Sequence, residues 1–200
     1  MKNSYLRAGA ALACAAVLSA CGGSDGELLL GGYVYGVTKA GLVLTNNGGS
    51  DYAVPAMASG SGEFYFPELI GTDDRYDVAV KESPSNTSGC TIENASGRAG
   101  YHVTTIYVTC TLKTHELAGS ISNLQGTLVL VNGSDRKEIA AGATSFQMEK
   151  IAEDSPYGVS ILTQPANQTC SISNGSGTMG TGNVSNIAIT CTSNTPEHQA

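Results

Sequence analysis

Four cysteines form two pairs with nearly equal spacing, and they are the side chains best placed for covalent chemistry. Cys90 and Cys110 enclose a stretch rich in Asn and Gly, and Cys170 and Cys191 enclose a second stretch of the same kind. An antiparallel hairpin folded about each Gly-rich break would place its two cysteines on opposite strands, with Cβ atoms about 4.5–5.5 Å apart. A disulfide needs about 3.5–4.5 Å between these atoms. We therefore predict the disulfides Cys90–Cys110 and Cys170–Cys191.

Four cysteines allow three pairings, and the repeated spacing favours this one. The spacing offers no close cysteine pair, so zinc is a poor alternative. Each bridge would stabilise the chain by about 3 kcal/mol in the chain-entropy model. That stabilisation matters because domains under about 80 residues are only marginally stable when burial of an apolar core is their sole source of stability.

The sequence predicts no catalytic residue, no cofactor and no metal. The histidines His102, His115 and His198 do not recur between the two halves of the chain. The chain has no phosphate-binding loop and no His-Glu-x-x-His motif. We therefore expect that the protein is not an enzyme.

Acidic residues crowd one predicted loop in each half, with Asp73, Asp74 and Asp77 in the first and Glu153 and Asp154 in the second. Calcium needs several oxygen ligands in one cage, and the loops lack the spacing of a known calcium motif. The simpler interpretation is a solvated acidic turn. Weak calcium binding is the alternative hypothesis, and a flat calorimetric titration with millimolar calcium would exclude it.

Tyrosine is concentrated in the first half of the chain. The alternation of residues along the strands predicts which way some of these tyrosine side chains point. Tyr65 and Tyr107 alternate with apolar neighbours that should face a core, so we expect their rings to point outward. Tyr33 and Tyr35 are candidates for the same exposed patch. Rigid, amphipathic tyrosines suit contacts with a protein or a glycan. The alternative is that these tyrosines are only good strand residues.

The first 21 residues have the pattern of an export signal. Lys2 and Arg7 precede a short apolar stretch at 8–17, which is too short to span a bilayer. The run Leu18-Ser19-Ala20-Cys21 follows, and it resembles the lipobox of bacterial lipoproteins at all four positions. The alternative is an ordinary secretory signal cleaved near Ala20.

The lipobox resemblance implies that Cys21 is acylated, with palmitate among the possible chains, and becomes the first residue of the mature protein. Several acyl chains anchor a protein durably, and an exported location makes disulfides reasonable. In the family, Asp after the cysteine often retains a lipoprotein at the inner membrane. Gly22 stands there in this sequence, so we expect an outer-membrane location, with the periplasmic or surface face left open.

The chain is acidic, with a formal net charge of −7. Removal of the signal would take away Lys2 and Arg7 and make the mature protein more acidic still. An acidic surface argues against nucleic acid as a partner. The expected partners are the membrane, through the N-terminal lipid, and an envelope protein or a glycan.

The chain repeats itself, as the cysteine pairs first indicate. Gly41–Asn46 aligns with Thr127–Asn132, and Tyr76–Val80 aligns with Tyr157–Ile161. Tyr76 and Tyr157 recur at the same strand start, and we expect each hydroxyl to bond a backbone group. The predicted segments are a signal peptide (1–20), a flexible tether (21–31), a first repeat (32–111), a linker (112–116), a second repeat (117–192) and a disordered tail (193–200).

Each repeat contains seven predicted short strands separated by Gly, Asn, Ser or Pro. The strands expected in the first repeat are 33–37, 42–45, 52–56, 63–66, 76–81, 90–93 and 104–110. Those expected in the second are 118–122, 127–131, 138–141, 145–149, 157–162, 169–173 and 186–191. The predicted fold is all-β, with two tandem seven-stranded antiparallel β-sandwich domains, each with a disulfide-clasped C-terminal hairpin.

The run Gly62–Leu69, a loop and the run Tyr76–Val80 resemble transthyretin-like or carboxypeptidase-regulatory-like domains, which are Ig-like sandwiches. The cysteine hairpins resemble modules that occur in tandem in bacterial surface and secreted proteins. These resemblances imply a fold and no activity. The predicted function is a lipid-anchored envelope protein with a non-catalytic structural or protein-interaction role. The alternative is a glycan-binding surface module that uses Tyr33, Tyr35, Tyr65 and Tyr107.

Overall fold

The computed structural model describes residues 27–49 and 51–194, so the lipobox, Cys21 and the signal peptide lie outside the described residues. All the regular elements within these ranges are β-strands. None of the described segments forms a helix with the length and apolar character needed to cross a membrane.

The first repeat has eight strands in two sheets. The first sheet has the order β4-β1-β8-β6 and the second has the order β3-β2-β5-β7. The strands are β1 (Leu30–Tyr35), β2 (Leu42–Asn46), β3 (Asp51–Val54), β4 (Ser61–Tyr65), β5 (Arg75–Glu82), β6 (Thr87–Glu93), β7 (Ser96–Arg98) and β8 (Val103–Leu112).

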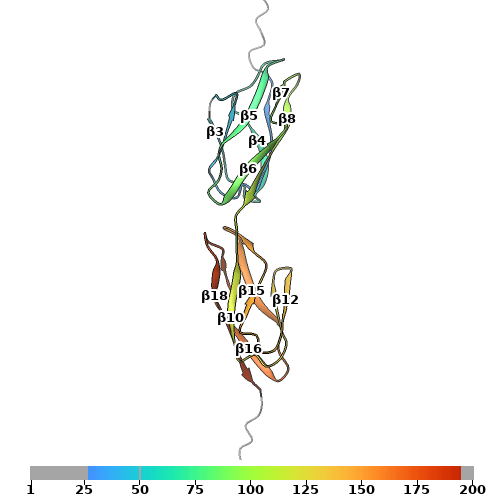
Figure 1. Cartoon of the computed structure of the whole chain (residues 1–200). Coiled ribbons are helices and arrows are strands. Elements are labelled where there is room, and N and C mark those ends of the chain that lie inside the picture. Colours follow the sequence, from blue (N-terminus) through green and yellow to red (C-terminus); the bar gives the residue numbers. More distant parts are fainter. Residues whose placement is uncertain (1–26, 50, 195–200) are drawn as a thin grey trace, which may run out of the picture.

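The second repeat has the same topology, with sheets ordered β13-β10-β18-β16 and β12-β11-β15-β17. Its strands are β10 (Leu117–Ser122), β11 (Leu128–Asn132), β12 (Asp135–Ile139), β13 (Ser145–Gln147), β15 (Pro156–Thr163), β16 (Gln168–Ser173), β17 (Ser176–Thr178) and β18 (Val184–Ser193). Two further short strands, β9 (Thr114–His115) and β14 (Ile151–Ala152), pair with each other. Figure 1 shows the two repeats arranged end to end. The predicted fold class of two tandem β-sandwich domains is thus confirmed.

Each repeat encloses its own apolar core, and the two cores use matching positions. Leu30 and Phe64 in the first repeat correspond to Leu117 and Phe146 in the second, and all four are buried. Met148 replaces a phenylalanine of the first repeat and is buried as well, so the substitution keeps the core filled. Strand alternation places these side chains inward because successive residues of a strand point to opposite faces.

The structure differs from the prediction in the number and direction of strands. The Gly-rich break of each cysteine hairpin holds an eighth strand, β7 or β17, which pairs with β5 or β15 in the opposite sheet. The first and last strands of each repeat are parallel neighbours, so the sheets are not purely antiparallel. β1 also begins earlier than predicted, because Leu30, assigned to the tether, is fully buried.

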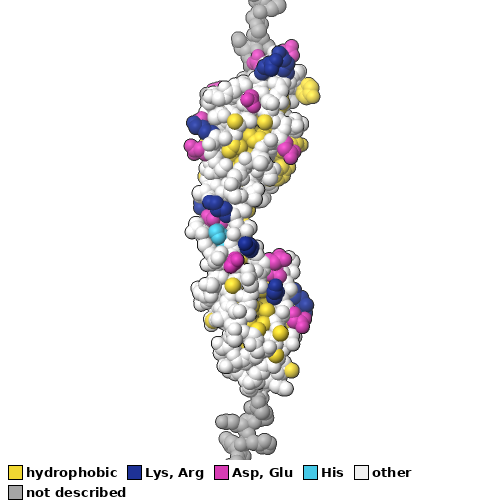
Figure 2. Space-filling view, in the orientation of Figure 1, with side chains coloured by type: hydrophobic (Ala, Val, Ile, Leu, Met, Phe, Trp, Pro, Cys, Tyr) yellow, Lys and Arg dark blue, Asp and Glu magenta, His cyan; other side chains and the backbone are white. Residues whose placement is uncertain are grey.

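The two repeats contact each other through Lys113, which lies between β8 and β9. Its amide donates to the Asn86 carbonyl at 2.9 Å, and its carbonyl accepts from the Glu153 amide at 2.9 Å. Asp154 of the second repeat accepts from the Asn86 side chain at 3.2 Å and lies 3.6 Å from Lys39 Nζ. Figure 2 shows basic, acidic and histidine side chains close together at this narrow junction. The predicted linker is therefore bonded on both sides.

Candidate functional site

Both predicted disulfides form, and each joins directly opposed residues of two antiparallel strands. Cys90 pairs with Cys110 between β6 and β8, and Cys170 pairs with Cys191 between β16 and β18. Three of these four cysteines are almost fully buried, and the fourth, Cys90, is half-buried. The disulfides are structural bonds that hold an edge strand to the sheet.

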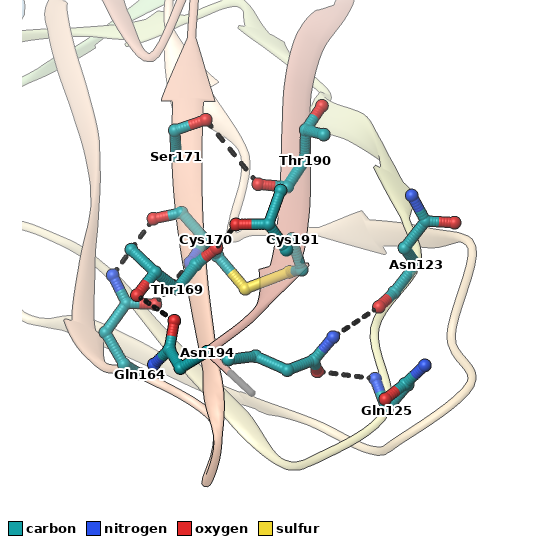
Figure 3. The surroundings of a disulfide bond; sticks show 11 residues. Asn123, Gln125, Gln164, Thr169, Cys170, Ser171, Thr190, Cys191 and Asn194 are labelled. Atoms are coloured by element: carbon teal, nitrogen blue, oxygen red, sulfur yellow. Dashed lines mark hydrogen bonds between the residues drawn. A yellow bond between two sulfur atoms is a disulfide. The ribbon is translucent and has the colours of Figure 1, made fainter. Parts of the chain in front are cut away.

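The second disulfide has additional polar support at the edge of its sheet (Figure 3). The Gln164 side chain donates to the Cys170 carbonyl at 2.9 Å and accepts from the Cys170 amide at 2.8 Å. These two bonds occupy backbone groups that an edge strand would otherwise offer to another chain. Gln164 therefore closes this part of the edge to strand addition.

The four candidate tyrosines lie together on the outer face of the β4-β1-β8-β6 sheet. Tyr33, Tyr35 and Tyr65 are among the exposed large side chains of the protein, and Tyr107 is half-buried. The Tyr65 ring lies over Gly31, where a Cβ would be 2.6 Å from a ring carbon. The structure therefore gathers onto one surface the residues that the sequence could only place strand by strand.

One register of this sheet carries an unbroken row of acidic and aromatic side chains. Glu63 on β4 is the partner of Tyr33 on β1, Tyr33 is the partner of Tyr107 on β8, and Tyr107 is the partner of Glu93 on β6. The rings of Tyr33 and Tyr107 are stacked, with centroids 6.1 Å apart and planes inclined by 16°. We call Glu63, Tyr33, Tyr107 and Glu93 the Tyr–Glu row.

Glu63 fixes two tyrosines at once. The Tyr33 hydroxyl donates to Glu63 Oε1 at 3.0 Å, and the Tyr65 hydroxyl donates to Glu63 Oε2 at 3.4 Å. The hydrogen bond to Glu63, followed by the negative charge of Glu63, raises the pKa of Tyr33. Partial desolvation and then the charge of Glu63 raise the pKa of Tyr65. An ordinary tyrosine is already protonated at neutral pH, so both phenols have a proton to direct at Glu63.

The second repeat has no such row on the same backbone. By topology, Ser145, Ser120, Ala188 and Ser173 occupy the positions of the row. The strands of that sheet carry no Asp, Glu, Lys or Arg. The two repeats therefore share a framework and differ in this surface. The fold forms without the Tyr–Glu row, so the row is not needed for folding.

Basic residues are also missing from the strands that carry the row. β1, β4, β6 and β8 contain no Lys or Arg, whereas Arg75, Lys81 and Arg98 lie on the other sheet of the same repeat. The outer face of the β4-β1-β8-β6 sheet therefore combines aromatic rings with negative charge.

Three acidic side chains of the loops considered for calcium have partners within the protein. Asp74 accepts from the Gly71 amide at 2.7 Å, Asp154 reaches across to the first repeat, and Glu153 Oε2 lies 3.3 Å from His115 Nε2. Within residues 27–49 and 51–194, no group of three or more His, Cys, Asp or Glu side chains is placed to hold a metal ion. The carboxylates of Asp74, Glu153 and Asp154 are therefore engaged within the protein.

The expected hydroxyl-to-backbone bonds of Tyr76 and Tyr157 are not among the hydrogen bonds of the described residues. Each ring instead covers a cross-strand glycine, Gly97 or Gly177, and a Cβ there would lie 2.7 Å from the hydroxyl oxygen. The recurrent tyrosines are structural, as predicted, but they act by covering a glycine.

Sequence reasoning missed Glu63 and Glu93 as members of the surface. Glu63 stands two residues before Tyr65 and therefore on the same face of its strand. Glu93 lies opposite Tyr107 once the cysteine hairpin sets the register. Both positions could be inferred from local sequence patterns. Glu63 and Glu93 become parts of one surface only because β1 lies between β4 and β8.

No protein-family model and no curated protein matches the chain. Among solved structures, the major pilin protein (T3.2) of Streptococcus pyogenes is similar at 11% identity and a TM-score of 0.35, covering 84% of this chain and 98% of its own. Two B repeat units of the collagen-binding protein of Staphylococcus aureus are similar at 16% identity and a TM-score of 0.30, covering 82% of this chain and 49% of that one. Likenesses of this size identify no function for the chain.

Proposed function

We propose that this protein is a lipid-anchored bacterial envelope protein with a non-catalytic role in holding a partner protein. The observation that carries the proposal is the Tyr–Glu row, which is present on one repeat and replaced by small polar residues on the same framework in the other. A surface that the fold does not require is available for recognition.

The proposed anchor rests on the sequence around Cys21. Replacement of Cys21 by Ala should release the protein into the soluble fraction and abolish incorporation of a palmitate analogue in cells. Retention of the label in the Cys21→Ala variant would contradict the lipid anchor. The outer membrane is the proposed location because Gly22 follows the cysteine, and sucrose-gradient separation of the two membranes tests it.

In-cell crosslinking of the full-length protein, followed by affinity recovery and mass spectrometry, tests the protein-interaction role. We expect one envelope protein in near-stoichiometric amount, with crosslinked peptides from β1, β4 or β8. The same experiment on a Tyr33→Ser, Tyr107→Ala variant is the matched control. If the variant recovers the same partner protein in the same amount, the Tyr–Glu row is not the binding surface.

Glycan binding is a second candidate because stacked, exposed tyrosines can also contact sugar rings. Replacement of Tyr65 and Tyr107 by Ala should abolish retention of the protein on envelope polysaccharide while both disulfides still form. Equal retention of the variant and the parent protein would exclude the glycan role of this face.

A further inference from the structure

The chemistry of the Tyr–Glu row selects among possible ligands. Tyr33 and Tyr65 direct their hydroxyl protons to Glu63, so these phenols present oxygen lone pairs to a ligand. An ionised carboxylate can only accept hydrogen bonds and has no proton to donate. This part of the surface therefore offers hydrogen-bond acceptors and aromatic rings, and it requires a ligand rich in donors.

Glu93 gives the row an uncommitted negative charge. It is exposed at the end of β6 and lies beside Tyr107, and the structure gives its side chain no hydrogen bond or ion pair within the described residues. None of the four strands of the sheet supplies a Lys or Arg to neutralise it. A cation brought by a partner would find a carboxylate next to an aromatic ring.

Arginine matches these features better than other groups. Its guanidinium has five donors and no acceptor, pairs with carboxylates through two parallel bonds and stacks on aromatic rings. A glycan hydroxyl carries one donor and two acceptor lone pairs, and a neutral glycan brings no positive charge to neutralise Glu93. The ammonium of lysine is a compact, strongly hydrated charge that stacks less well.

We propose that the outer face of the β4-β1-β8-β6 sheet binds an arginine-bearing segment of a partner protein, with a guanidinium paired to Glu93 and placed over the stacked rings of Tyr33 and Tyr107. The inference rests on the proposed protein-interaction function and names the chemistry of the partner.

The test is binding of fluorescein-labelled hexa-arginine to the full-length protein in detergent, measured by anisotropy at physiological salt. We expect hexa-lysine to bind more weakly than hexa-arginine. Glu93→Ser should weaken hexa-arginine binding by about tenfold or more, because it removes a charge-assisted bond. Tyr33→Ser combined with Tyr107→Ala should weaken it to a similar extent. These replacements are the residues that the second repeat carries at the same positions, so both variants should fold and form both disulfides.

Glu138→Ser is the matched control, because it removes one exposed negative charge from β12 of the second repeat. We expect it to change the affinity by less than about twofold. Equal losses in Glu93→Ser and Glu138→Ser would show non-specific charge attraction and overturn the inference. Binding that survives the loss of both tyrosines would overturn it as well.

Two further results separate this inference from the proposed function. Neutral oligosaccharides that bind the parent protein and fail to bind the tyrosine variant would assign the face to glycans. A partner that crosslinks to this face in cells, but is not displaced by hexa-arginine, would overturn the arginine chemistry and leave the protein-interaction role intact.

Discussion

Glu63 organises the aromatic surface because one carboxylate accepts from two phenols. The hydrogen bond and the charge of Glu63 both favour the protonated form of Tyr33, so the pKa of this tyrosine is raised in the folded protein. A raised folded pKa means that the interaction stabilises the fold below about pH 10, the ordinary tyrosine value, and that this stabilisation is lost as pH rises through the folded pKa.

Glu63→Gln should therefore lower the pKa of Tyr33 toward the ordinary tyrosine value, because the amide keeps an acceptor but loses the charge. Carbon-13 NMR of labelled tyrosine ring carbons, followed through an alkaline titration, measures this pKa directly. Glu93→Gln is the control, since Glu93 lies on the far side of Tyr107 and does not bond Tyr33. Equal shifts in both variants would mean that general surface charge, and not the Glu63 hydrogen bond, sets the pKa.

At the scale of the strands, one glycine in each repeat allows the first and last strands to approach. Gly32 on β1 and Gly119 on β10 are buried beside the backbone of Ile106 and Ile187, and a Cβ at either position would collide with a carbonyl oxygen. Close backbone approach of this kind is a recognised use of glycine in strands.

Gly32→Ala and Gly119→Ala should each destabilise the affected repeat by about 1–3 kcal/mol, the usual range for overpacking. Urea unfolding checks this. Tyrosine fluorescence reports mainly on the first repeat, because Tyr157 is the only tyrosine of the second one, and far-ultraviolet circular dichroism follows both repeats. Gly158→Ala on β15 is the control, because its Cβ would meet nothing within 4 Å. A loss of stability in Gly158→Ala as large as in the other two variants would refute the steric explanation.

The elements also show how far the sequence could be interpreted. Counting inward from the predicted disulfide pairs Thr91 with Thr109 and Glu93 with Tyr107, as observed, because a covalent bond fixes the register. The crossing of β7 to the opposite sheet was not predictable, since its residues Ser, Gly and Arg carry no strand signal. The parallel neighbourhood of β1 and β8, which brings Tyr33 beside Tyr107, depends on contacts between distant segments that no local pattern encodes.

At the scale of the whole molecule, the junction holds the repeats through a few polar contacts. Asp154 provides two of them, to the Asn86 amide and to Lys39. Lys39 and Asp154 are each about half exposed, so their ion pair contributes at most about 1 kcal/mol. Asp154→Ala should therefore leave both repeats folded while widening the range of angles between them. Distances between spin labels on the two repeats, measured by pulsed electron paramagnetic resonance, report that range.

Asp73→Ala is the matched control for this prediction. Asp73 occupies the equivalent loop of the first repeat and has the same positive φ of 64° as Asp154, so both substitutions impose the same backbone strain. Its contacts stay within its own repeat. A distance distribution that is equally narrow in the parent protein and in Asp154→Ala would assign the rigidity of the junction to its other contacts, such as the backbone bonds of Lys113 and the pairing of β9 with β14.

The parallel pairing of β1 with β8, and of β10 with β18, has a mechanical consequence. The chain enters each repeat at one end of this strand pair and leaves at the other end, so tension along the molecule slides the two strands past each other. All the hydrogen bonds between them then bear the load together and do not open one by one. Each disulfide also keeps the residues between its two cysteines from extending when the repeat unfolds. The contour length gained on unfolding one repeat is therefore shorter by roughly 70 Å. Stretching single molecules in an optical trap, with and without a reductant, should show high unfolding forces and this difference in length.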